Sequence, residues 1–256
     1  MKRCGFGYLK VDYNENIGIG CDGAESLGEG LRQHIEGVYA FFQKIRREVP
    51  DIVIEICSSG GHRLEPSMLS LGSMGSFSDA HECLEIPVIA ANLHRLILPQ
   101  QNQIWAVLRK NDSQRRIAYS LANTFMGRMC ISGDVDDLNT YQWEKVIEGC
   151  DFYNRIRHII RDGISLRYGP DIRSYRHLRG WQGLLRMTAD GNEAYMVLHS
   201  FAQPPERIEL MLPETGWQVS RVFNNEAVRI NLEGNTLIVS MTGEFNACGI
   251  HLSYTA

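Results

Sequence analysis

The sequence lacks the features that mark a membrane protein or a disulfide-stabilised secreted one. No apolar run approaches the roughly 18 residues that span a bilayer, and the opening residues, MKRCGFGYLK, hold no apolar signal segment. The seven cysteines are scattered, odd in number and never spaced as C-x-x-C, which argues against a disulfide framework or a zinc site. We therefore expect a cytoplasmic protein with no membrane partner.

An excess of basic residues is missing too, since 26 Lys and Arg stand against 30 Asp and Glu. Non-specific nucleic-acid binding needs a positive surface that neutralises phosphates, so nucleic acid is not an expected partner. The eight histidines show no H-E-x-x-H spacing, and no metal is expected. What remains is an ordinary globular composition, 44% hydrophobic and 22% charged, in a chain of one or two domains.

Strand-like and helix-like segments alternate along the chain as far as residue 161. Short apolar runs end in polar or Gly-rich loops, and longer amphipathic segments follow them. The first of these apolar runs, residues 5–12, is expected to be a short buried strand. The expected strands cover residues 5–12, 52–57, 75–79, 104–108 and 128–132. The expected helices cover residues 25–48, 81–97, 113–126 and 140–161. This alternation predicts βα units and a parallel sheet, either a barrel or an open sheet.

The pattern changes after Gly163. Seven short runs of strand type follow between residues 184 and 252, separated by turn signals such as Asp190-Gly191 and Glu233-Gly234. They predict an antiparallel β domain, in the form of a small sandwich.

Polar side chains gather where the early strands end. Alternation puts Lys10, Asp12 and Asn14 on one face of a strand, where the ammonium would keep the neighbouring carboxylate ionised. Asp12 and Asp79 end different strands and would face each other across a barrel mouth. Retaining glycosidases use such a pair about 5–5.5 Å apart, and inverting ones use a wider pair. A plain loop-capping role for Asp12 stays open on these residues alone.

The segment CSSGGHR, residues 57–63, offers backbone N–H groups and little side-chain bulk, so a ligand could approach it closely. An ordinary tight turn at Gly60-Gly61 explains the glycines equally well. A catalytic thiol at Cys57 is disfavoured, because nothing in the sequence marks a third group that would orient His62 beside it.

Taken together, three motifs resemble glycoside hydrolase family 36, the α-galactosidase family. They are GYLKVDYN, ICSSGGHRLEPSML and FSD, in this order, and the closing GEFNACGIHL is similar to the family's C-terminal sandwich. The resemblance covers essentially the whole chain. It implies an α/β plus all-β fold: the second half of a (β/α)8 TIM barrel, strands 4–8, followed by a C-terminal antiparallel β-sandwich. The barrel part would occupy residues 1–165 and the sandwich residues 166–256.

The resemblance also implies a role for each matching residue. Asp12 would be the nucleophile and Asp79 the general acid/base. Lys10 and Asn14 would hold sugar hydroxyls. The remaining residues of the implied subsite, near the sugar's 2-hydroxyl, are Cys57 and Gly60. The implied reaction is double displacement on α-galactoside oligosaccharides of the raffinose type, with retention and no cofactor. A homo-oligomer of the full-length protein stays open.

Departures from the family pattern leave the substrate open. Val11 stands for the usual Trp between Lys and Asp, Ser76 for the Trp three residues before the acid/base, and His62 for a glycine; Leu64-Glu65 replaces a common Phe-Asp. Raffinose-synthase-like relatives also carry Val at the first position. Galactosyl transfer to another sugar and an α-N-acetylgalactosaminidase are therefore alternatives.

A different class of alternative is an inactive carbohydrate-binding remnant. By resemblance the chain starts at the fourth barrel strand, and the strands before it would supply two aspartates and an aromatic side chain to the sugar site. We therefore expect the isolated chain to hydrolyse galactosides slowly or not at all. Half a barrel would also expose sheet edges.

Overall fold

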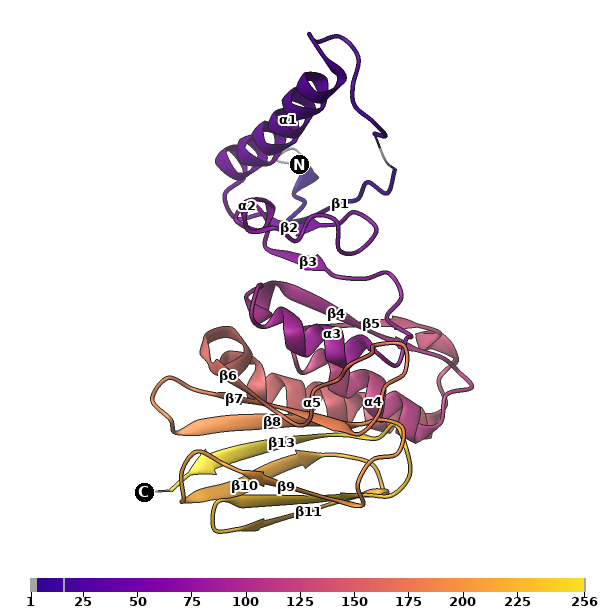
Figure 1. Ribbon diagram of the computed structural model, residues 1–256, viewed down its shortest axis with the longest axis vertical. Helices are drawn as coiled ribbons and strands as arrows, with labels where there is room; N and C mark the ends of the chain where they lie inside the picture. The colour runs from indigo at the N-terminus through magenta and orange to yellow at the C-terminus, as the bar shows by residue number, and fades with distance from the viewer. Residues whose placement is uncertain (1–3, 16, 256) are drawn as a thin grey trace. The chain divides into compact units, whose positions relative to one another are not determined.

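The computed structural model describes residues 4–15 and 17–255 (Figure 1). Its contacts divide the chain into two compact units, residues 1–79 and 80–256. The boundary expected at residue 165 stays a prediction. No helix in the described part of the chain is long and apolar enough to cross a membrane.

The first unit is built from three parallel strands and two helices. The strands are β1 (Tyr8–Val11), β2 (Val53–Ile56) and β3 (Met74–Ser76), and the helices are α1 (Leu27–Glu48) and α2 (Pro66–Leu69). β1 pairs in parallel with β2, and β2 with β3. Ser26 begins α1 as its N-cap, where its hydroxyl accepts the Glu29 N–H at 3.1 Å. The helix predicted over residues 25–48 is therefore confirmed, with a start at Leu27 and an end at Glu48.

Helix α1 covers one face of this small sheet. Phe42, Ile54 and Ile56 form the buried centre, and Leu9 and Val11 of β1 pack against it. The expectation of a buried first strand is wrong, because no β1 side chain is fully buried. β1 lies at the edge of its sheet, and α1 covers only one of its faces.

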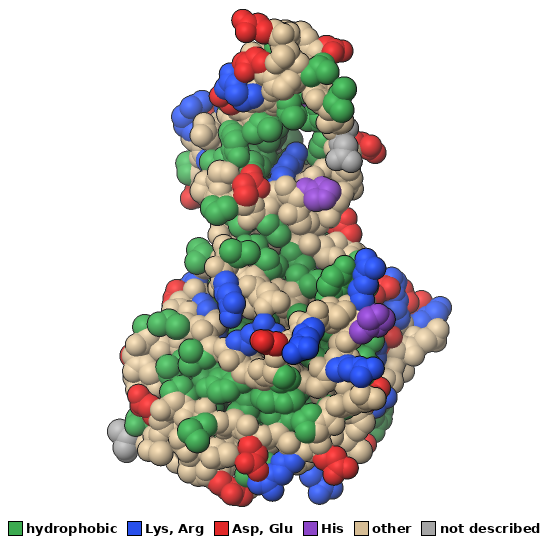
Figure 2. All heavy atoms as spheres, in the orientation of Figure 1, with side chains coloured by type: hydrophobic (Ala, Val, Ile, Leu, Met, Phe, Trp, Pro, Cys, Tyr) green, Lys and Arg blue, Asp and Glu red, His purple; other side chains and the backbone are tan. Residues whose placement is uncertain are grey.

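The same unit exposes several large apolar side chains, and in Figure 2 hydrophobic side chains gather over the region of α1. Phe6 is 64% exposed and Phe41 is 50% exposed. A patch of this kind is typical of a surface that another part of a protein covers.

The second unit begins with helices and two parallel strands. These elements are α3 (Ile86–Leu93), β4 (Asn102–Leu108), α4 (Gln114–Thr124), β5 (Arg128–Gly133) and α5 (Thr140–Asp162). The helix expected over residues 81–97 is shorter than predicted, because Pro87 sits in the first turn and turns precede it. Asn139 and Gln142 cap α5 reciprocally.

Two antiparallel sheets complete this unit. Their strands are β6 (Ile164–Tyr168), β7 (Trp181–Met187), β8 (Glu193–Ser200), β9 (Arg207–Met211), β10 (Trp217–Phe223), β11 (Val228–Glu233), β12 (Thr236–Met241) and β13 (Ala247–Tyr254). The sheet orders are β10-β13-β8-β7-β6 and β11-β12-β9. Strand β6 was not among the seven predicted runs, and the other seven strands correspond to them.

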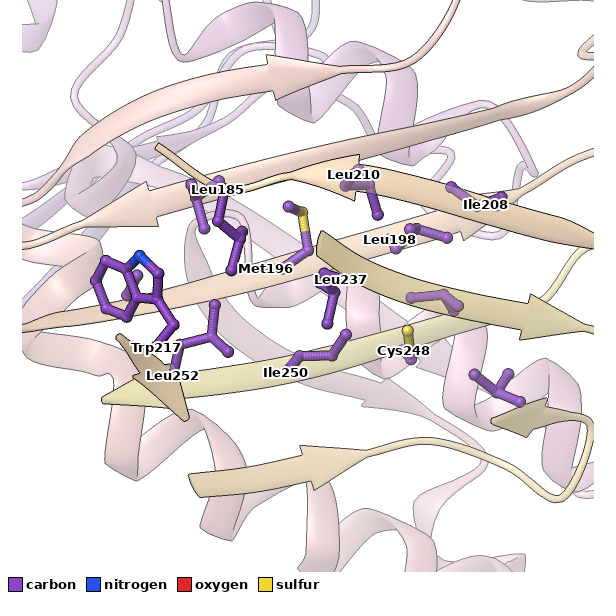
Figure 3. Packing of buried hydrophobic residues seen from close by; sticks show 14 of the residues in the cluster. Leu185, Met196, Leu198, Ile208, Leu210, Trp217, Leu237, Cys248, Ile250 and Leu252 are labelled. Atoms are coloured by element: carbon purple, nitrogen blue, oxygen red, sulfur yellow. The ribbon is translucent and has the colours of Figure 1, made fainter. Parts of the chain in front are cut away.

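The predicted sandwich is confirmed by the core between the two sheets. Figure 3 shows Leu185 and Met196 from one sheet against Leu210 and Leu237 from the other. The outer face of the larger sheet is covered by α4 and α5. There, Phe125, Phe152 and Phe223 pack with ring centroids 4.8–6.2 Å apart.

Candidate functional site

Strand pairing in the first unit places the predicted polar residues on one face. Lys10 lies opposite Glu55 in the parallel register of β1 and β2, and the Cys57 N–H extends the ladder by donating to the Val11 carbonyl at 2.9 Å. Alternation therefore sets Lys10, Asp12, Glu55 and Cys57 on the face opposite α1. Val11, which stands for the family's Trp, packs toward α1 instead.

Lys10 lies between two carboxylates. Its Nζ atom is 3.5 Å from Glu55 Oε1 and 4.0 Å from Asp12 Oδ2. Burial alone would lower the pKa of Lys10, but the charges of Glu55 and Asp12 and a hydrogen bond to Glu55 outweigh it and raise the pKa above its usual value. The side chain is therefore a permanent cation beside Asp12.

Glu55 is a site residue that the sequence interpretation missed. It is only 4% exposed, and the Tyr8 hydroxyl donates to its Oε2 atom. A signal was present, because Glu55 is the one charged residue in the apolar run IVIEIC. A charge in an otherwise apolar strand is rare unless it is paired.

Cys57 connects Asp12 with the glycine loop. The side chain is 1% exposed, and burial raises the pKa of its thiol; a hydrogen bond and the charge of Asp12 raise it further, against the Gly60 N–H and the Lys10 cation. A protonated thiol donates to the carboxylate and is a poor nucleophile. This setting agrees with the expectation that Cys57 is not a catalytic thiol, and it places the thiol beside Asp12.

The loop after β2 packs closely on the segment that leads to Asp79. A Cβ atom added to Gly60 would lie 2.4 Å from the Ser78 Cα atom, and Gly60 has φ +78°. Only glycine fits this approach. The ordinary-turn alternative explains the positive φ but not the contact. Asp79 itself is exposed and follows β3, so Asp12 and Asp79 both lie beyond the carboxyl ends of strands in one parallel sheet.

Asn14 fixes the loop after β1 to the loop after β2. Its Oδ1 atom accepts the Ser59 N–H at 2.7 Å, and the Ser58 hydroxyl donates to the Tyr13 carbonyl. This gives Asn14 a local structural contact beside the predicted sugar contact. Arg63 supports the same loops, because it donates to the Cys57 carbonyl at 3.3 Å and lies 5.9 Å from the centroid of the Tyr13 ring.

A cavity of about 370 Å³ lies against α1, with a mainly apolar wall that includes Val38, Phe41 and Phe42 and that Asp12 and Arg63 also line. Among residues 4–15 and 17–255, no group of three or more His, Cys, Asp or Glu side chains is arranged to hold a metal ion.

Ser76, which stands where the resemblance expects a Trp, lies on the face of the sheet that carries Lys10 and Cys57. Glu55 lies opposite Met74 in the register, so alternation puts Ser76 on the same face as Cys57. Its hydroxyl donates to the Ser78 carbonyl at 2.8 Å. A small side chain here leaves room where the resemblance expects an indole.

Parallel βα units, polar residues at the carboxyl ends of strands and a following pair of antiparallel sheets define the class of fold as part of a (β/α) barrel with a C-terminal sandwich. Residues 1–163 match the family model described as melibiase. The chain therefore belongs to the melibiase family, the α-galactosidases of glycoside hydrolase family 36. No curated protein sequence matches it.

Solved structures of three α-galactosidases share the fold. The Lactobacillus brevis enzyme is 14% identical with a TM-score of 0.80, over 100% of this chain and 36% of that one. The family 36 enzyme AgaA from Geobacillus stearothermophilus, in complex with 1-deoxygalactonojirimycin, is 17% identical with a TM-score of 0.79, over 97% and 35%.

The galactosidase domain of the α-galactosidase-sucrose kinase AgaSK is 14% identical with a TM-score of 0.77, over 97% and 34%. The chain thus spans about a third of the length of these relatives. Its fold is confirmed as part of a (β/α)8 barrel followed by antiparallel sheets.

Proposed function

We propose that the chain carries the catalytic centre of a retaining α-galactosidase that acts on terminal α-galactosides of the raffinose type. Structures of AgaA from Geobacillus stearothermophilus have been solved with raffinose and with stachyose, which supports this substrate class. Asp12 is the nucleophile and Asp79 the general acid/base, and no cofactor takes part.

The chemistry follows from the two carboxylates. Asp12 attacks the anomeric carbon while the bond to the leaving oxygen breaks, and Asp79 gives that oxygen its proton. Asp79, now ionised, takes a proton from water as the water attacks the galactosyl-Asp12 ester. Two inversions give net retention. Lys10 and Asn14 hold sugar hydroxyls, and Cys57 and Gly60 line the same subsite near the 2-hydroxyl.

The observation that carries the proposal is the setting of Asp12. Its carboxylate ends a parallel strand, lies 4.0 Å from the Lys10 ammonium and accepts from the buried Cys57 thiol. An ammonium and a thiol donor beside the carboxylate orient it on the strand face where a nucleophile is expected. A carboxylate that merely capped a loop would not need a cation and a thiol on its strand face.

The stereochemistry of azide products tests both roles. With α-galactosyl fluoride, whose leaving group needs no proton, Asp12→Gly should form β-galactosyl azide in a single inversion. Asp79→Gly should form α-galactosyl azide, because azide then intercepts the galactosyl-enzyme. Nuclear magnetic resonance of the products distinguishes the two anomers. The same anomer from both variants would contradict the assignment.

Ser76 favours a second candidate, an α-N-acetylgalactosaminidase, since a 2-acetamido group needs room on this face. The corresponding p-nitrophenyl glycosides decide between the two sugars by their relative kcat/KM. Galactosyl transfer was suggested by Val11, which raffinose-synthase-like relatives share. It has weaker support, because Val11 packs toward α1 and not on the face that carries Lys10 and Cys57. Free galactose from raffinose, without a longer sugar, would exclude transfer.

A further inference from the structure

Glu55 is a buried carboxylate that the proposed mechanism does not use. It comes from the middle of β2 and is 4% exposed, with an Oε1 atom that solvent does not reach. Replacing a buried ion pair by apolar residues is often neutral or stabilising. Here only Glu55 is buried, and the Lys10 side chain is 35% exposed, so solvent also weakens what the pair contributes to folding.

The location of the pair points to the site. Glu55 Oε1 lies 3.5 Å from Lys10 Nζ, while Asp12 Oδ2 lies 4.0 Å from the same atom. A distance of 4.0 Å exceeds hydrogen-bond range. Glu55 thus draws the ammonium away from a direct contact with the nucleophile.

Tyr8 fixes the other end of this arrangement. Its hydroxyl donates to Glu55 Oε2, which leaves Oε1 directed to Lys10. The order along the face is Tyr8, Glu55, Lys10 and Asp12; the first three are on β1 or β2, and Asp12 directly follows β1. Strands hold such groups more rigidly than loops do.

We propose that Glu55 is a positioning residue that holds the Lys10 ammonium off Asp12, so that Lys10 can bind a sugar hydroxyl and the Asp12 carboxylate stays open to the anomeric carbon. This proposal rests on the proposed function for its sugar. Without the Glu55 charge, the Lys10 ammonium is no longer held in one place beside Asp12, so it reacts more readily and no longer meets the sugar hydroxyl in a fixed position.

Lysine reactivity tests the positioning without any sugar. The chain has five lysines, so acetylation by acetic anhydride can be followed at each by mass spectrometry. Glu55→Gln keeps the size and removes the charge; it should speed acetylation of Lys10 about threefold, with Lys110 unchanged as an internal reference. Glu55→Asp should restore part of the slow rate. Glu29→Gln on exposed α1 is the matched control and should change nothing at Lys10.

Galactose binding tests the link to the sugar. In titrations followed by nuclear magnetic resonance, Glu55→Gln and Lys10→Met should each weaken galactose binding about tenfold, and the double variant should bind as weakly as Lys10→Met alone. Additive losses would overturn the positioning role, since they mean that Glu55 acts on folding and not through Lys10.

The outcomes separate the two proposals. If the wild-type chain does not bind galactose, the proposed function fails, and the acetylation rates alone decide the role of Glu55. An unchanged Lys10 rate in Glu55→Gln overturns the positioning role whatever galactose does. Should Glu55→Gln fail to fold, Tyr8→Phe replaces it, because it frees Glu55 without changing charge and should speed Lys10 acetylation in the same direction.

Discussion

At the scale of single residues, the site is a set of charges whose neighbours decide their states. Lys10 is a cation held between two carboxylates, and Cys57 is a thiol held protonated beside Asp12. The sequence motifs predicted Lys10, Asp12 and Cys57 as neighbours of one site. They did not predict Glu55, because strand register and not spacing brings it to Lys10.

The reactivity of Cys57 should reflect its surroundings. Burial and Asp12 raise its pKa, so less thiolate is present at neutral pH than in an ordinary cysteine. Alkylation by iodoacetamide should therefore be much slower at Cys57 than at exposed Cys4, and the rate should keep rising above about pH 9. Peptide mass spectrometry measures both rates. Equal rates for the two thiols would contradict the buried, Asp12-bound state.

At the scale of elements, the long helices could be predicted from the sequence, and some of the strands could not. The long helices α1 and α5 were predictable because periodicity and capping residues agree. Strand β6 was not, since only Gly163 separates it from α5 and its five residues, although they alternate, are too few to stand out from the end of that helix. The burial of β1 was wrong because a sequence does not show which strand lies at a sheet edge.

The close approach of Gly60 to Ser78 should make this loop sensitive to one methyl group. Gly60→Ala adds both a positive-φ penalty and a backbone clash, and should lower the free energy of unfolding by about 3 kcal/mol. Urea denaturation followed by circular dichroism measures the change.

Gly191→Ala is the matched control for this substitution. Gly191 has φ +73° with nothing within 4 Å of an added Cβ atom, so only the conformational penalty of about 1 kcal/mol applies. If both variants lose the same stability, the Gly60 clash is not real.

At the scale of the whole molecule, the chain holds two compact units and about a third of the length of its relatives. Asp12 is 41% exposed, and electrostatic stabilisation of a transition state is strongest where water is excluded. The motifs supplied the family and the fold, which the family model and the solved structures confirm. They could not supply solvent access, which depends on what packs beside β1.

Solvent access leads us to expect low turnover. Purified chain should release p-nitrophenol from p-nitrophenyl α-galactoside only slowly, measured by absorbance against an Asp12→Ala control. Fast release that Asp12→Ala abolishes would show that the exposed carboxylate is already fully competent.

His199 should make the stability of the second unit depend on pH. It is fully buried against the Tyr119 ring, with centroids 5.1 Å apart, and burial lowers its pKa to about 3. The unfolded chain binds a proton there below about pH 6.5 and the folded chain does not, so stability is lost as the pH falls. The loss should reach about 2 kcal/mol at about pH 5.

The matched variant for this prediction is His199→Leu, which removes the titrating group and keeps an apolar side chain. Its free energy of unfolding should fall less than that of the wild type over the same pH range. Parallel pH profiles would mean that His199 is not the titrating group.

The central claim is that Asp12 is the nucleophile of a galactoside-cleaving site. The most direct measurement is covalent labelling by a galactose-configured cyclophellitol epoxide, which alkylates a carboxylate nucleophile in place of the sugar. Peptide mass spectrometry should find the adduct on Asp12, suppressed by excess galactose and absent from Asp12→Asn. An adduct on any other carboxylate, or none on the wild-type chain, would contradict the claim.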